Sequence, residues 1–177
     1  NGCTTTYTYD SDYNLLSRQN GLGAIWTYTW DDGFIESAQN PLGQTTTYLH
    51  HATAVSGPRL GTIIRPEGQR TTYNYDGSNL LASIQSPLGE LTTNVWNGSS
   101  QRTAVVDPLG NRTSYAYSGL NLLQSVTNPV GATTTFVFDS KGNRIATENP
   151  LGFRTSHTFN AAGQIVSTEN ALGNRTT

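Results

Sequence analysis

The chain has 177 residues and a formal net charge of −2, with 34% hydrophobic and 12% charged residues. This charge gives no electrostatic reason to expect a nucleic-acid partner, and neither a signal peptide nor an apolar run long enough for membrane insertion is present. Nine Tyr, five Phe and three Trp argue against disorder, because disordered chains are poor in aromatic residues. Rings and abundant Thr favour β-strands instead.

A glycine recurs about every 21 residues and divides the chain into repeat units. We expect a single array over residues 1–177, with units at about 2–22, 23–42, 43–67, 68–88, 89–109, 110–130, 131–151 and 152–172, and a partial unit at 173–177. After Gly2, the glycines that mark the repeat are Gly23, Gly43, Gly68, Gly89, Gly110, Gly131, Gly152 and Gly173.

Each unit opens with a predicted strand that has two different faces. The fifth and seventh residues after the glycine share one face, because strand side chains alternate, and they are nearly all aromatic. We expect this face to be packed, with aromatic beside aromatic in adjacent strands at about 0.5–1.5 kcal/mol per pair. The stacking or core rings are Tyr7, Tyr9, Tyr28, Trp30, Tyr48, Tyr73, Tyr75, Trp96, Tyr115, Tyr117, Phe136, Phe138 and Phe159. The fourth residue is Thr or Ser in all units, which gives a hydroxyl-rich opposite face.

The rest of each unit reads as a turn, a second strand and a closing turn. Turn residues such as those at 76–79 and 139–143 follow the first strand of their units. A second, apolar-leaning strand comes next in each unit, as at 80–84, 122–126 and 164–167. Each unit closes with a phrase such as Asn-Pro-Leu-Gly at 40–43, which fits a type I turn. No window shows a helical period. The predicted fold is all-β, a spiral or solenoid of antiparallel β-hairpin repeats of about 21 residues.

Two segments, Gln69–Asp76 and Asn111–Tyr117, carry the clearest family resemblance. They resemble the YD repeat of bacterial Rhs and wall-associated proteins, Tc toxin shells and teneurins. The resemblance covers essentially the whole chain, although the Tyr-Asp pair is complete only at 9–10 and 75–76. It implies a continuous β-sheet spiral wound into a hollow shell or barrel. It also implies a role in enclosing, presenting or connecting something, without catalysis by the repeats.

The chain ends bear on the predicted function. The sequence has no Met, so we expect a processed product or a window of a longer chain. Both ends lie in the same phase of the repeat without a polar cap, and open sheet edges invite pairing. We therefore expect a non-catalytic, secreted or cell-surface protein that pairs with copies of itself in a fibre or scaffold, or with neighbouring repeats of a longer chain. The alternatives are a fragment of a hollow shell that encloses a toxin, and a teneurin-like adhesion or carbohydrate-binding module.

No catalytic residue, metal site or cofactor is expected from the polar motifs. His50 and His51 are adjacent in a strand and point to opposite faces, so they cannot share one ion. Asp107-Pro108-Leu109-Gly110 resembles the phrase of a self-cleaving aspartyl protease in some Rhs cores, but no partner phrase for a carboxylate dyad exists. The acids at 31–32 and 10–12 offer oxygen ligands for Ca²⁺, yet they fit solvated turns better.

Covalent modification is the last feature that the sequence suggests. Three sequons make Asn97, Asn111 and Asn174 candidates for glycosylation, and glycans are therefore candidate partners. Cys3 is the single cysteine, so no disulfide forms within the chain, and an intermolecular disulfide is the alternative to a partly buried thiol.

Overall fold

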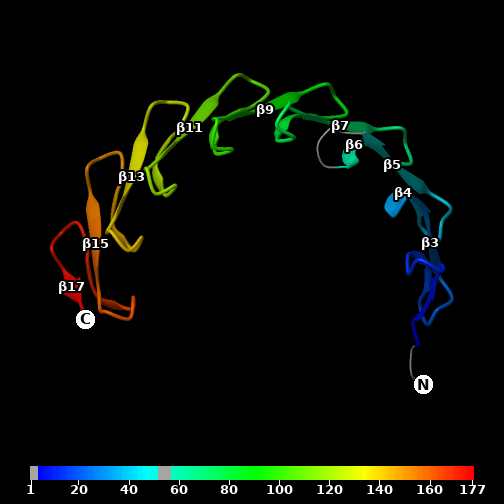
Figure 1. Cartoon of the computed structure of the whole chain (residues 1–177), viewed down its shortest axis with the longest axis horizontal. Helices are drawn as coiled ribbons and strands as arrows, with labels where there is room; N and C mark the ends of the chain where they lie inside the picture. The colour runs from blue at the N-terminus through cyan, green and yellow to red at the C-terminus, as the bar shows by residue number, and fades with distance from the viewer. Residues whose placement is uncertain (1–3, 52–56) are drawn as a thin grey trace. The chain divides into compact units, whose positions relative to one another are not determined.

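The computed structural model describes residues 4–51 and 57–177. Over these two ranges the chain forms seventeen β-strands and no helix (Figure 1). The described strands belong to two compact units, the first ending at Leu91 and the second beginning at Thr92. The predicted all-β fold of antiparallel hairpin repeats is confirmed.

The first unit contains β1 to β8 in a meander, in which each strand pairs antiparallel with the strand before and after it. Its strands are β1 (Thr6–Tyr9), β2 (Leu15–Gln19), β3 (Ile25–Asp31), β4 (Phe34–Gln39), β5 (Thr45–His51), β6 (Arg59–Ile64), β7 (Arg70–Tyr75) and β8 (Leu81–Gln85).

The second unit repeats this meander from β9 to β17. Its strands are β9 (Leu91–Trp96), which starts at the last residue of the first unit, β10 (Arg102–Val106), β11 (Arg112–Tyr117), β12 (Leu123–Thr127), β13 (Thr133–Phe138), β14 (Arg144–Glu148), β15 (Arg154–Phe159), β16 (Ile165–Glu169) and β17 (Arg175–Thr176).

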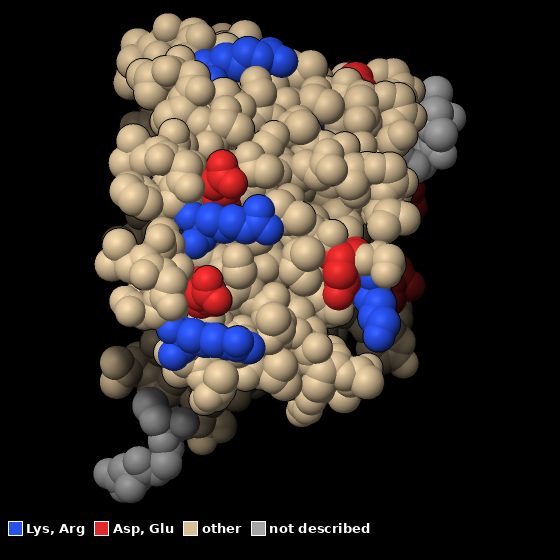
Figure 2. Space-filling model, turned by 90° about the vertical axis from the view of Figure 1, so that its left-hand side faces the viewer, with Lys and Arg blue, Asp and Glu red and all other residues tan. Residues whose placement is uncertain are grey.

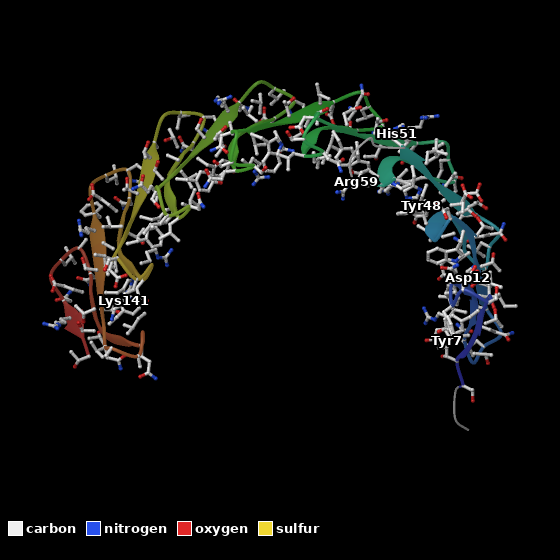
Figure 3. The ribbon with its side chains drawn as sticks, in the orientation of Figure 1. Tyr7, Asp12, Tyr48, His51, Arg59 and Lys141 are labelled. Atoms are coloured by element: carbon white, nitrogen blue, oxygen red, sulfur yellow. The ribbon has the colours of Figure 1, made fainter. Side chains whose placement is uncertain are left out.

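Each unit is a single layer of sheet. Within a unit, the described strands contact only their neighbours in the chain, so nothing from the same unit packs against either face. Side chains stand on both surfaces of the ribbon (Figure 3). Among the described residues no large side chain is fully buried, and the buried apolar residues are Ala104 and Ala146. A domain normally buries its core between two layers, so these units depend on contacts between neighbouring strands instead.

Closing turns and most hairpin tips share one hydrogen-bond pattern, whereas the β3–β4 tip is a two-residue turn with Asp32 and Gly33 at φ values of 47° and 77°. In the closing turn at 40–43, Gly43 N–H donates to the Asn40 carbonyl over 2.9 Å, and Asn40 N–H donates to the Gln44 carbonyl over 3.0 Å. Gly43 has a φ of 79°, which completes a type I turn with a left-handed fourth residue, as predicted for this phrase. At the hairpin tip 10–13 the pattern is the same, with Tyr13 at a φ of 65°.

The second strand of each hairpin carries a β-bulge that was not predicted. In the first hairpin, Thr8 pairs with Ser17 and Tyr9 pairs with Leu15, which leaves Leu16 as the extra residue. The same register shift, next to the seventh position, recurs in the other hairpins. A bulge increases the local twist and redirects side chains, so it sets where each seventh-position ring lies.

Candidate functional site

The aromatic face differs from the expected arrangement in its register. The fifth-position rings lie on the first strand of each hairpin, and the second strand separates them from the rings of the next unit. Tyr73 therefore faces Ile84, and Tyr115 faces Val126. Rings of successive units lie two strand spacings apart, about 10 Å. The prediction of aromatic beside aromatic in adjacent strands is wrong at these positions, because each hairpin places its own apolar strand between them.

Burial on this face is partial. Tyr7 is 49% exposed and Tyr9 is 56% exposed, and the other predicted rings are half-buried. Three arginines from second strands fill space beside the rings. Their guanidinium carbons lie over ring centroids at 5.0 Å for Arg18 and Trp26, 5.3 Å for Arg102 and Tyr115, and 5.6 Å for Arg144 and Phe136. Such contacts contribute about 0.5–1 kcal/mol at exposed sites.

Three seventh-position rings also bond the preceding hairpin. The donor is a Tyr hydroxyl or a Trp N–H, and the acceptor is a backbone carbonyl fifteen residues earlier, beside the bulge. The bonds are Trp30 Nε1 to Leu15 at 2.8 Å, Tyr75 Oη to Leu60 at 3.1 Å and Tyr117 Oη to Arg102 at 3.0 Å. These contacts were missed from the sequence, where the rings were assigned to apolar packing. The sequence does carry a signal for these bonds, because Tyr or Trp, whose rings carry a hydrogen-bond donor, recur at the seventh position.

The opposite face is built from small and hydroxyl side chains. In most units the sixth residue after the glycine pairs with a small residue nine positions later along the chain. Thr8 and Ser17 hydroxyls are 2.7 Å apart, and those of Thr158 and Ser167 are 2.8 Å apart. Where the sixth residue is valine, as at Val137, the partner is Ala146, which is 0% exposed. This pairing is not evident from the sequence, because the sixth residues are chemically mixed and only the register shows which residue faces each of them.

Histidines lie in three separate environments. The His50 ring is 5.3 Å from the Phe34 ring, and His157 Nδ1 is 3.0 Å from Thr168 Oγ1. His51 lies at the end of the β5–β6 hairpin as the register partner of Arg59 (Figure 3), and its ring covers Gly61. In residues 4–51 and 57–177 no three His, Cys, Asp or Glu side chains are grouped so that they could hold a metal ion.

Most of the acids singled out from the sequence lie in turns, although Asp31 is the last residue of β3 and pairs with Phe34. Asp107 Oδ1 accepts N–H bonds from Leu109 (2.9 Å) and Asn111 (2.8 Å), and Oδ2 accepts one from Asn111 Nδ2 (2.8 Å). The Asn111 side chain is the main reason why the pKa of Asp107 is lowered. Side-chain bonds from Asn14 and Asn143 lower the pKa of Asp10 and Asp139 in the same way. The bonds that Asp107 accepts in the turn favour the ionised form of its carboxylate. In an aspartyl dyad, by contrast, two carboxyl groups share a proton.

The modification candidates lie at exposed turns. Asn97 caps its tip by accepting N–H bonds from Ser99 and Gln101, both at 3.0 Å, and its Nδ2 donates to the Gln101 side chain at 2.8 Å. Asn111 Nδ2 donates to Asp107, as described above, and Asn174 is exposed. Glycosylation at these three sites stays a prediction. Cys3 lies outside the described residues.

Charged side chains form a pattern on the second unit that the sequence analysis did not identify. Figure 2 shows basic and acidic groups alternating down one face. The register pairs Glu148 with Arg154 and Glu169 with Arg175 across neighbouring strands. Opposite charges that face each other across a sheet contribute about 0.2–1 kcal/mol relative to Ala pairs.

No helix in the described part of the chain is long and apolar enough to cross a membrane.

The sequence of β9 to β13 identifies the repeat. Residues 96–133, which include the Tyr117 bond and four complete turns, match the family model "RHS Repeat". The chain contains an RHS repeat. The YD/Rhs resemblance drawn from the sequence is therefore confirmed. A search among curated proteins finds no match to this RHS-repeat chain.

Solved structures share the fold. The RHS-repeat chain is similar to a chain of "Crystal Structure of TcdB2-TccC3-Cdc42", with a TM-score of 0.52 and 12% identity over 93% of this chain. It is also similar to "Crystal Structure of TcdB2-TccC3 without hypervariable C-terminal region", with a TM-score of 0.51, 11% identity and 93% coverage. In both comparisons it spans 13% of the matched chain. Identity at this level shows a common fold alone.

Proposed function

We propose that this chain is a wall segment of a hollow β-sheet shell and that its repeats have an enclosing role without catalysis. The observation that carries the proposal is the single-layer sheet. Strands contact only their neighbours within each unit, and no large side chain of the described residues is fully buried. Such a sheet separates two spaces instead of forming a compact core.

The comparisons support this reading over the fibre that the sequence first suggested. The family resemblance of the RHS repeat implies a shell. The structurally similar chains are much longer, and this chain spans 13% of each of them. A chain that corresponds to 13% of a longer shell protein fits the role of one segment of its wall. Under this proposal the partners are neighbouring repeats of the same wall, the enclosed cargo is a toxin, and the shell acts outside the producing cell. The fibre and the adhesion module remain alternatives that the experiment below can distinguish.

Negative-stain electron microscopy of the natural polypeptide that contains this sequence tests the proposal. Its intact mass should be measured on the same preparation. We expect closed hollow particles, each accounted for by the mass of its component chains. Long regular filaments would contradict the shell and support end-to-end assembly instead. Solid particles that bind a glycan array through the exposed rings would support the adhesion module.

A further inference from the structure

Two exposed arginines of the second unit occupy a register position that is aliphatic in the other hairpins. This residue lies at the start of the second strand of a hairpin and faces the seventh-position ring. Arg102 faces Trp96, and Arg144 faces Phe138. The equivalent residues of the other hairpins are Leu15, Ile35, Leu60, Leu81, Leu123 and Ile165. Most hairpins therefore fold with an aliphatic residue here, so folding does not require the two arginines.

The two faces of the second unit carry different charges. Glu148 and Glu169 lie opposite fourth-position residues in the register, so they belong to the hydroxyl-rich face. Asp107 and Asp139 cap turns by accepting bonds from the turn N–H groups. These are the acidic side chains of residues 92–177, all of which the structure describes. The aromatic face of this unit therefore carries two arginines whose charge no acidic side chain on the same face offsets.

A hollow of about 300 Å³ opens on the aromatic face beside the second arginine. We call it the phenylalanine hollow, and its lining residues are Leu123, Phe136, Phe138 and Arg144. Both Phe rings are half-buried, so part of each ring surface is open to a ligand. Ligand pockets range from about 300 to 1,000 Å³, which gives this hollow room for a single large side chain.

The guanidinium groups are positioned to bind carboxylates. The Arg144 carbon lies 5.6 Å from the centroid of the Phe136 ring, and the Arg102 carbon lies 5.3 Å from that of Tyr115. Contact with a ring leaves the N–H groups at the edge of the guanidinium available, and this planar fork can bind a carboxylate with two parallel bonds. The strands of the two arginines, β10 and β14, are four strand spacings apart, about 19 Å.

We propose that the aromatic face of the second unit binds an extended acidic polypeptide segment. An aromatic side chain of the segment occupies the phenylalanine hollow, and the carboxylate next to it binds Arg144. A second carboxylate binds Arg102. Because an extended chain advances about 3.3 Å per residue, about six residues separate the two acids. This inference goes beyond the enclosing role of the wall and does not depend on it.

Amide-detected NMR of the isotope-labelled chain under reducing conditions tests the site. The probe is the acetylated and amidated peptide SEGSGSFEGS, which carries one Glu after its Phe and another six residues earlier. We expect saturable shift changes at the lining residues of the phenylalanine hollow, with a Kd on the order of 1 mM. Replacing the Phe of the peptide by Ala, or both Glu by Gln, should raise the Kd about fivefold, equivalent to about 1 kcal/mol.

Variants of the chain assign the two carboxylate contacts. Arg144→Gln should raise the Kd of SEGSGSFEGS about fivefold, as expected for an exposed ion pair of about 1 kcal/mol. Arg102→Gln should have a similar effect on this peptide but none on SQGSGSFEGS, which lacks the first Glu. Arg112→Gln is the matched control, because it removes the same charge from the hydroxyl-rich face, where Arg112 Nε donates to Ser114. It should leave the Kd unchanged. Circular dichroism verifies that the variants keep their strands.

Several results would overturn the proposal. Equal weakening by Arg112→Gln and Arg144→Gln would show that net charge attracts the peptide without a site on the aromatic face. Absence of saturable shift changes at the phenylalanine hollow would remove the site. Equal affinity for 3-phenylpropionate would assign the hollow to small aromatic acids instead of a polypeptide.

The two proposals fail separately. Filaments in electron microscopy, combined with specific peptide binding, would remove the wall and leave the binding site. Hollow particles from the natural polypeptide, combined with no peptide binding, would remove the site and leave the wall.

Discussion

At the seventh position of a unit, a single hydroxyl or N–H group determines whether the ring also bonds the preceding hairpin. Tyr117 donates to the Arg102 carbonyl at 3.0 Å, whereas the equivalent Phe138 lies beside Leu123 without a donor. We expect Tyr117→Phe to lower the free energy of unfolding by about 0.5–1.5 kcal/mol, the net contribution of one hydrogen bond.

Phe138→Tyr is the reciprocal test, because it supplies the missing donor fifteen residues after Leu123. It should raise stability by a similar amount, about 0.5–1.5 kcal/mol. Urea denaturation followed by fluorescence measures both variants. If Tyr117→Phe is neutral and Phe138→Tyr is destabilising, the hydroxyl does not link neighbouring hairpins.

Three turn-capping carboxylates make stability depend on pH. The pKa values of Asp10, Asp107 and Asp139 are lowered in the folded chain, chiefly by a bond from the Asn side chain four residues later. A lowered folded pKa means that the stabilisation is fully present above the unfolded value of about 3.9 and is lost as pH falls through the folded pKa. We therefore expect the melting temperature of the parent chain to fall between about pH 5 and pH 2.

The matched variant replaces all three by Asn. Asn already occupies this turn position at Asn40 and Asn160, where it accepts the same two N–H bonds from the turn. The triple variant should therefore fold at pH 7 and show a smaller loss of melting temperature in acid. Scanning calorimetry across the pH series provides the measurement. An identical acid response in both proteins would assign the effect to other carboxylates.

Among the elements, closing turns and most hairpin tips share one turn whose fourth residue is left-handed, but the two edges place different residues at that position. Gly110 has a φ of 84° in a closing turn, while Ser100 has a φ of 58° at a tip. A side chain in this region costs about 1–2 kcal/mol, so Gly110→Ala should destabilise the chain by that amount.

Ser100→Gly removes the same strain at a tip, and the extra entropy of an unfolded glycine offsets about 0.5–1 kcal/mol of the gain. The net effect should lie between neutral and about 1 kcal/mol of stabilisation. Thermal unfolding of the two variants beside the parent chain measures both. Equal destabilisation by Gly110→Ala and Ser100→Gly would show that φ is not the deciding property.

The sequence allowed prediction of these elements because turns and strands leave local signals. Spacing of Gly43 and its equivalents predicted the hairpins, and the Pro-Leu-Gly phrase predicted the closing turn. Local signals did not predict the bulge at Leu16 or the bond that the Leu15 carbonyl accepts from Trp30. They depend on which residues face each other across two strands, and pairing register is a property of the assembled sheet. The ring–ring contacts failed for the same reason, because only the register reveals that Ile84 faces Tyr73.

At the scale of the whole molecule, single-layer packing makes stability a property of neighbouring strands. In the second unit, each strand contacts only the strands before and after it, so disruption should spread by nearest-neighbour steps. Val126 pairs with Tyr115 in the β11–β12 ladder. Val126→Pro removes a backbone donor there and fixes φ at a value that disfavours a central strand. Val126→Ala is the matched control, because it shortens the side chain and keeps the backbone donor.

Amide hydrogen exchange read strand by strand should separate this picture from cooperative unfolding. In Val126→Pro, we expect protection to fall most in β11, β12 and β13, less in β14, and to stay near the parent level in β16. Val126→Ala should weaken the same strands only slightly. Loss of protection to the same extent from β10 to β16 would mean that the unit unfolds as one cooperative body. A wall that tolerates local damage needs the graded result, because a lesion in one hairpin then leaves the distant strands of the same sheet closed.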